Sequence, residues 1–225
     1  NVSEHYVWLK DDPTTAFKEE FEQKLKAWKE ADLINEEEFK YLQTDRPVTP
    51  TIYFLPQVHK NLNNPPGRPT VSFIGSLLEN TSRFIYIFLF PYVSALPSYL
   101  RDTTDILSRI NGIPWKHDYW MATVDMVSLY TSINHNNGIK VAEHFLRSRP
   151  IRLLEHSCLH IDMLSFCLQH NVLTFDEHFF WKQQGKAMGT YFAPTYANLM
   201  MGWWEEVLIW TEANQELLAH VDLWV

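Results

Sequence analysis

Asp125 is the side chain whose position in the sequence most clearly allows chemistry. The residues before it, Trp120–Val124, form an apolar, partly β-branched run, which predicts a buried strand that ends at this carboxylate. A carboxylate leaving a buried strand is costly to desolvate unless it is hydrogen-bonded, paired or bound to a cation. Ser128 and Tyr130 follow closely with a hydroxyl group and an aromatic ring. Taken alone, the stretch allows two interpretations of Asp125, a cation ligand or a cap of the next turn.

A small basic group flanks a predicted β-hairpin. Ile52–Leu55 and Arg68–Ser72 have the composition of strands, and the residues between them are rich in turn formers. His59 and Lys60 precede this loop, and Arg68 follows it. Arginine binds phosphate in a bidentate manner and lysine binds it as a point charge. A phosphate site and ordinary solvated surface charge are both consistent with this pattern.

Potential zinc ligands crowd one predicted helix. Two histidines four residues apart share a face, and a cysteine and a histidine three apart form a second pair. The two pairs are separated by about seven to eleven residues, too far to close a tetrahedral site on a straight helix. We therefore interpret the segment as a packed helix without zinc. The side chains concerned are His156, Cys158, His160, Asp162, Cys167 and His170.

Length and composition indicate a globular protein with a substantial core. The 225 residues are 46% hydrophobic and 15% aromatic. Cys158 and Cys167 cannot form a disulfide framework and favour a reducing, intracellular location, nuclear or cytoplasmic. The sequence shows no signal-peptide pattern, and its longest apolar run, 84–93, contains Pro91 and is too short to span a bilayer. We expect no membrane partner. The net charge of −8 lowers the expectation of nucleic-acid binding but leaves room for a local basic patch.

Periodicity and turn residues predict the elements that must position these side chains. Residues 1–45 are expected to form amphipathic helices, with Asn35 and Glu38 as a capping box. A glycine-punctuated turn over 183–189 leads into a long helix whose small residues would allow close approach to a sheet. The other expected elements are helices over 77–96, 102–112, 137–147 and 153–170, a hairpin of 172–175 with 179–182, the long helix over 190–213, and an apolar strand over 218–225 that contains Asp222.

Several of these stretches occur in a recognisable order. Tyr53–Lys60 and Pro66–Ser72 resemble the fingers motifs of Penelope-like retroelement reverse transcriptases. Val124–Ile133 resembles polymerase motif A of that family. Gly185–Thr190 and the following Ala193–Leu199 resemble motif B. Four ordered motifs make a chance match an unsatisfactory explanation.

The resemblance covers roughly residues 45–225 and implies a fold. It implies an α+β, right-hand polymerase architecture with fingers and palm, and with the thumb missing. Residues 1–45 would be a helical lead-in, 46–119 the fingers-like region and 120–225 a truncated palm-like region. By the same resemblance the partners are an RNA template, a DNA primer and deoxynucleoside triphosphates.

The resemblance also assigns a metal centre. Template-directed nucleotidyl transfer uses two magnesium ions, which need carboxylate oxygens from two palm strands. Asp125 would supply one carboxylate and Asp222 of motif C the other. The family has an aromatic residue before two consecutive aspartates at motif C, whereas this chain has His220 in the aromatic position and Leu223 in place of the second aspartate. The site is therefore expected to lack one negative charge.

Five further residues acquire nucleotide-binding roles through the resemblance. Lys60 and Arg68 would steady the incoming triphosphate. Tyr130 would place its ring against the 2′ position of the sugar. Gly185 and Gly189 would allow the backbone to approach the nascent base pair and the template closely.

The function expected from the sequence is that of a reverse transcriptase-like domain, an RNA-directed DNA polymerase by ancestry. The altered motif C and the missing thumb predict a truncated, inactive copy of a mobile element. Two alternatives stay open. The chain could be a non-catalytic scaffold that binds nucleic acid or protein, or a helical structural module without a site.

Overall fold

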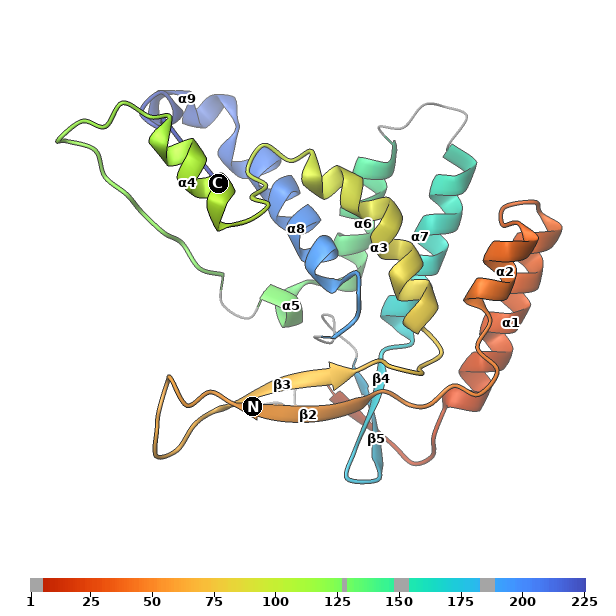
Figure 1. The fold of residues 1–225 in the computed structure, drawn as a ribbon. Coiled ribbons are helices and arrows are strands. Elements are labelled where there is room, and N and C mark those ends of the chain that lie inside the picture. The colour runs from red at the N-terminus through yellow and green to blue at the C-terminus, as the bar shows by residue number, and fades with distance from the viewer. Residues whose placement is uncertain (1–5, 127–128, 148–153, 183–188) are drawn as a thin grey trace.

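The structure is a computed structural model that describes residues 6–126, 129–147, 154–182 and 189–225. Within these ranges the chain forms one open, mixed β-sheet and a group of helices. The helices α3, α6, α7 and α8 gather on one side of the sheet, and α1 and α2 stand beside them (Figure 1). The predicted mixture of helices and strands is therefore confirmed at the level of its secondary structure.

The sheet has five strands in the order β1-β5-β4-β2-β3. Neighbouring strands are antiparallel except for β2 and β4, which run parallel and meet where Thr51 pairs with Thr174. Both predicted hairpins are present. In the second of them Asp176 and Glu177 have φ angles of 49° and 61°, as a tight two-residue hairpin turn requires. The strands are β1 (Tyr6–Leu9), β2 (Thr51–Pro56), β3 (Gly67–Ser72), β4 (Val172–Phe175) and β5 (His178–Lys182).

The helices begin and end close to their predicted positions in most cases. The capping box of Asn35 and Glu38 is formed, and Asp102 caps the helix after it by accepting from the backbone N–H of Asp105. No helix in the described ranges is both long and apolar enough to cross a membrane. The α-helices are α1 (Thr14–Glu30), α2 (Glu36–Leu42), α3 (Glu79–Ser94), α4 (Thr103–Asn111), α5 (Leu129–Ser132), α6 (His135–Arg147), α7 (Leu154–Gln169), α8 (Ala193–Trp204) and α9 (Gln215–Leu218).

The main core lies between helices, and the lead-in helices belong to it. Phe21 of α1 is 1% exposed and lies against Phe166 of α7, with 5.2 Å between ring centroids. The carboxylate of Asp162 on α7 accepts hydrogen bonds from the Trp28 indole at 3.0 Å and from the Lys24 ammonium at 2.8 Å. These contacts attach α1 to α7, so the lead-in helices are part of the helical layer. Tyr6–Leu9 was expected to belong to the helical lead-in, but it forms strand β1 of the sheet because it pairs with β5.

The predicted long helix over 190–213 is shorter than expected and packs on helices. α8 ends at Trp204, and a π-helical turn, η3 (Glu205–Ile209), follows it. The small residues of α8 were expected to approach a sheet, but α8 contacts α3 and α6. A Cβ atom on Gly202 would lie only 2.5 Å from the Leu96 side chain. Gly202 therefore permits a close approach of α8 to the segment that follows α3.

Two predicted strands are absent, and these predictions were wrong. Trp120–Val124 has no regular secondary structure, and Trp120 and Val124 are 95% and 86% exposed. The stretch 218–225 begins at the end of α9 and continues without a strand. A strand needs a neighbour for its backbone hydrogen bonds and a surface on which to bury its side chains. Neither segment pairs with another strand among the described residues.

Candidate nucleic-acid interface

The β2–β3 hairpin carries a concentration of basic and aromatic side chains. Residues 46–78 contain no aspartate or glutamate, although the whole chain has a net charge of −8. Tyr53 and Phe54 of β2 are each 44% exposed, and the ring of Phe54 makes an edge contact with Phe175, with 5.8 Å between centroids. Aromatic rings beside cationic groups can stack on the bases of a single strand while the cations bind its phosphates.

Lys60 and Arg68 lie where the hairpin prediction placed them. Arg68 sits on β3 opposite Leu55 of β2, and Lys60 follows β2 in the connecting loop. Both side chains are exposed, and neither forms an ion pair with a residue in the described ranges. Their positive charges are therefore available to an anionic ligand.

The loop between the two strands is ordered by its own hydrogen bonds. The side-chain oxygen of Asn61 accepts from the backbone N–H groups of Asn63 and Asn64, each at 3.0 Å. The backbone N–H of Gln57 donates to the carbonyl of Pro66 at 2.9 Å, which closes the base of the loop. These bonds hold the two flanks of the loop together and limit the distance that separates its basic groups.

Gly189 contacts the hairpin through its backbone. Its φ angle is 132°, a conformation that side chains disfavour. A Cβ atom at this position would lie 1.8 Å from the carbonyl oxygen of Val71 on β3, so only glycine fits. The segment that resembles motif B is thus brought against the fingers-like hairpin. Gly185, its predicted partner, lies outside the described residues.

Tyr130 lies on the short helix α5, between the hairpin and α8 in the view of Figure 1. α5 contacts α8, and the half-buried Tyr130 ring packs against the helical core. The predicted contact of this ring with a sugar stays a prediction. The stretches that resemble motif A and motif B lie next to each other, since α5 contacts α8.

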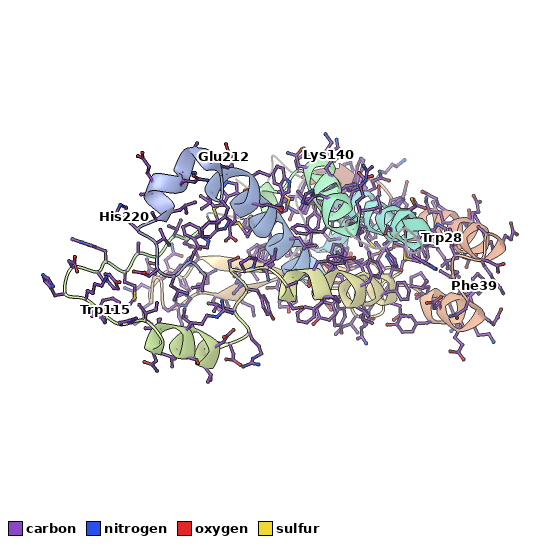
Figure 2. The ribbon with its side chains drawn as sticks, turned by 90° about the horizontal axis from the view of Figure 1, so that it is seen from above. Trp28, Phe39, Trp115, Lys140, Glu212 and His220 are labelled. Atoms are coloured by element: carbon purple, nitrogen blue, oxygen red, sulfur yellow. The ribbon has the colours of Figure 1, made fainter. Side chains whose placement is uncertain are left out.

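The two predicted metal ligands lie on irregular segments. Asp125 is exposed at the end of the stretch 113–126, and Asp222 is exposed near the C-terminal residue. The negative charge of Asp222 lies close enough to Lys116 to affect its ammonium group. A hydrogen bond with Tyr119 is the main cause that raises the pKa of the Lys116 ammonium, and the charge of Asp222 adds a smaller contribution. In agreement, Figure 2 shows Trp115 and His220 at the same end of the molecule, opposite Trp28 and Phe39.

These residues do not fit a two-magnesium centre as they are arranged. Two hard divalent cations require several converging carboxylate oxygens held in fixed geometry. Within the described ranges no three metal-ligating side chains come together. Asp125 and Asp222 are exposed, no strand holds either of them, and Leu223 offers no oxygen. The expectation that two palm strands would present the carboxylates was therefore wrong for this arrangement.

His160 of α7 and His170, which directly follows this helix, pack against aromatic rings. His160 is stacked on the ring of Phe88, with 3.4 Å between centroids. His170 is stacked on Phe166 at 3.8 Å, and its ring nitrogens lie 2.9 Å from the Phe166 carbonyl oxygen and 3.0 Å from the Glu20 carboxylate. Both rings contribute to the packing of α7 against its neighbours.

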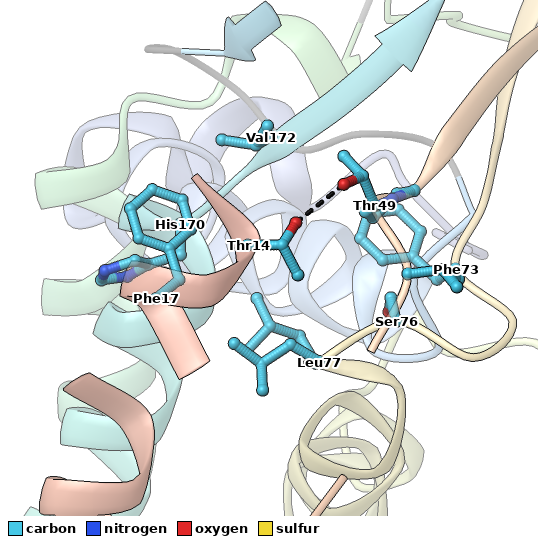
Figure 3. A pocket seen from close by; sticks show the side chains of 11 residues that line it. Thr14, Phe17, Thr49, Phe73, Ser76, Leu77, His170 and Val172 are labelled. Carbon is cyan, nitrogen blue, oxygen red and sulfur yellow. Dashed lines mark hydrogen bonds between the residues drawn. The ribbon is translucent and has the colours of Figure 1, made fainter. Parts of the chain in front are cut away.

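A small pocket lies beneath the hairpin, where α1 meets the sheet (Figure 3). The hydroxyls of Thr14 and Thr49 are hydrogen-bonded at 2.7 Å, and the Thr49 hydroxyl donates to Asp12 at 2.8 Å. The cavity measures about 20 Å³, enough for one water molecule but not for a nucleotide. The hydrogen bonds at its edge join the start of α1 to the segment that leads into strand β2.

The exposed aromatic residues of the hairpin, Tyr53 and Phe54, were predicted as strand residues and not as part of a site. The absence of acidic residues from 46–78 is the signal that could have identified the region. In an acidic chain such a stretch marks the place where an anion is least repelled.

Comparisons with protein-family models, with curated proteins and with solved structures find no match for this chain. The resemblance to Penelope-like reverse transcriptases therefore rests on the ordered sequence motifs. In the structure, Gly189 lies against strand β3 and α5 contacts α8, so three of the stretches that carry the resemblance lie close together.

Proposed function

We propose that the chain is a reverse transcriptase-like domain that binds a single nucleic-acid strand at its β2–β3 hairpin without catalysing nucleotidyl transfer. The contact of Gly189 with the carbonyl oxygen of Val71 carries this proposal. It joins a segment that resembles motif B to one that resembles the fingers, across more than a hundred residues of sequence. A right-hand polymerase requires such an approach, because these two parts together face the template.

The chemistry of the hairpin supports a strand of nucleic acid as its ligand. Lys60 and Arg68 supply unpaired positive charge, and Tyr53, which lies on the same face of the strand pair as Arg68, supplies an exposed ring. Phosphate contacts give affinity without sequence preference, and ring stacking selects unpaired bases over a closed duplex. An RNA template is the partner expected from the resemblance.

The described part of the chain lacks the arrangement of carboxylates that nucleotidyl transfer requires. Two-metal transfer needs carboxylates that hold both cations in line with the reacting oxygens. Asp125 and Asp222 lie on irregular, exposed segments, and Leu223 stands where the family has an aspartate. Among the described residues no three histidine, cysteine, aspartate or glutamate side chains come together to hold a metal ion.

Strand binding can be tested by fluorescence anisotropy with a labelled single-stranded RNA. Two or three phosphate contacts predict that affinity falls about tenfold between roughly 50 and 200 mM salt. The double variant Lys60→Ala, Arg68→Ala should remove most of the binding and flatten this salt dependence. Lys40→Ala is the matched control, because Lys40 is an exposed lysine on α2. Binding unaffected by the double variant would contradict the proposal.

The absence of catalysis has its own test. A primer–template duplex with magnesium and deoxynucleoside triphosphates should show no primer extension. Extension by the wild-type chain that disappears in Asp125→Asn would overturn the non-catalytic part of the proposal and restore the two-carboxylate site.

One observation favours a second function, that of a protein-interaction scaffold. The stretch 113–126 exposes a run of large apolar side chains, with Trp115 at 58%, Trp120 at 95% and Met121 at 69%. Apolar surface of this kind on a folded chain marks an interaction site. Binding to a partner through this stretch would be insensitive to salt and to the hairpin variant, which distinguishes the two functions.

A further inference from the structure

Lys182 is a buried amine without a hydrogen-bond partner. It ends strand β5, its side chain is 1% exposed, and no described residue accepts a hydrogen bond from its Nζ atom. Its backbone is well satisfied, because its N–H donates to the Asn171 carbonyl at 2.9 Å. Buried lysines are rare unless they are paired, so this side chain calls for a chemical explanation.

Burial shifts the Lys182 amine towards its neutral form, although the ammonium still predominates at neutral pH. The Nζ atom lies over the ring of Tyr6, 4.6 Å from the ring centroid. Burial, the only cause that contributes, lowers the pKa of Lys182 to about 8. Tyr6 is the titratable group that faces it, and burial raises the pKa of that phenol. A neutral amine is a nucleophile, whereas an ammonium ion is not.

Strand β1 covers the amine. Tyr6 of β1 pairs in register with Lys182 of β5. β1 has only four residues, is an edge strand of the described sheet, and exposes 39% of Val7 and 60% of Trp8. Short edge elements with little buried surface open at low cost. Movement of β1 would therefore uncover the Nζ atom without disturbing the helical core.

We propose that Lys182 is a nucleophilic amine that condenses with small aromatic aldehydes when strand β1 lifts. The Nζ lone pair attacks the carbonyl carbon to form a carbinolamine, which then loses its hydroxyl group as water. The nitrogen gives up its two protons in the process, the product is an imine, and no oxidant or reductant is consumed. An aromatic aldehyde suits the site because its ring can occupy the place of the Tyr6 ring. This chemistry is independent of strand binding at the hairpin.

The test uses benzaldehyde with cyanoborohydride, which reduces each imine to a stable amine that peptide mass spectrometry can locate. At about pH 7 the neutral fraction favours Lys182, and we expect its labelling to exceed that of the exposed Lys40 by about tenfold. Tyr6→Ala leaves room for the aldehyde ring, which takes the place of the Tyr6 ring and keeps the amine covered in the complex, and should accelerate labelling of Lys182 while leaving Lys40 unchanged. Labelling of Lys182 that is slower than that of Lys40 in both proteins would overturn the proposal.

The pH profile provides a second readout that needs no variant. The rate of labelling at Lys182 should rise to a plateau with a midpoint near the lowered pKa of about 8. An ordinary exposed lysine, with a pKa of about 10.4, gains reactivity only at higher pH, and Lys40 serves as the exposed comparison. Coincident profiles for the two lysines would contradict a neutral, nucleophilic Lys182 even if Tyr6→Ala failed to fold.

Discussion

The β2–β3 hairpin and the stretch 113–126 both contain apolar residues that favour strands, but only the hairpin forms them. In the hairpin each strand has a hydrogen-bonded partner, and Val71 is buried at 5% exposure. In 113–126 the backbone pairs with no strand of the described residues, and Val124 is 86% exposed. The difference teaches that β propensity becomes a strand only where a partner and a surface are within reach.

The two regions also differ in their charge. The hairpin belongs to a stretch without acidic residues, whereas the segment that ends at Asp125 and the one around Asp222 present carboxylates. The hairpin is thus suited to an anionic strand. The two carboxylates are suited to cations, but they lack the strands that would bring their oxygens together.

The largest effect is expected for Gly189→Ala, whose new Cβ atom would clash with the backbone of strand β3. A Cβ atom would lie 1.8 Å from the Val71 carbonyl oxygen, at a backbone with a φ angle of 132°. We expect a loss of about 3 kcal/mol in the free energy of unfolding, measured by urea denaturation. Gly112→Ala is the control, because Gly112 has a φ angle of −76° and no contact closer than 3.4 Å. An equal loss in both variants would contradict a specific role for Gly189.

A smaller effect is expected for Asp12→Ala at the base of the hairpin. Burial alone would raise the pKa of Asp12, but hydrogen bonds from Thr14 and Thr49 outweigh it and lower this pKa. Because the carboxylate is largely exposed, the variant should lose only about 0.5–1 kcal/mol near neutral pH. Asp11→Ala, at a neighbouring exposed aspartate, should be close to neutral.

The same carboxylate predicts a pH dependence. A lowered folded-state pKa means that the unfolded chain binds the proton more readily, so the stabilisation is complete above the unfolded value of about 3.9. It is lost as the pH falls below that value through the lowered pKa of the folded state. Thermal melts of wild type and Asp12→Ala should therefore converge in acid. A difference that persists unchanged at low pH would exclude the carboxylate as its source.

The smallest effect is expected for Val124→Ala in the stretch 113–126. Its side chain is 86% exposed, so the free energy of unfolding should change by less than about 0.5 kcal/mol. Val71→Ala makes the same chemical change at a buried position and should cost about 2 kcal/mol. Similar losses in the two variants would mean that Val124 is buried in solution and that the predicted strand exists there.

Local chemistry allowed much of the fold to be predicted. The helix over 14–30 followed from apolar residues at helical spacing, and the capping box of Asn35 and Glu38 is formed as expected. Both hairpins followed from turn residues between short apolar runs. These features depend on residues close together in sequence, so their energetics are contained in the sequence pattern itself.

Only the tertiary structure decided which strands have partners and which side chains meet. Nothing local places β4 between β5 and β2, or distinguishes Trp120–Val124 from a true strand, because pairing depends on segments far apart in the chain. The contact of Gly189 with Val71 and the burial of Lys182 beneath Tyr6 are of the same kind. The sequence by itself determined the residue types available for binding, while long-range packing determined which of them have partners and which remain free to react.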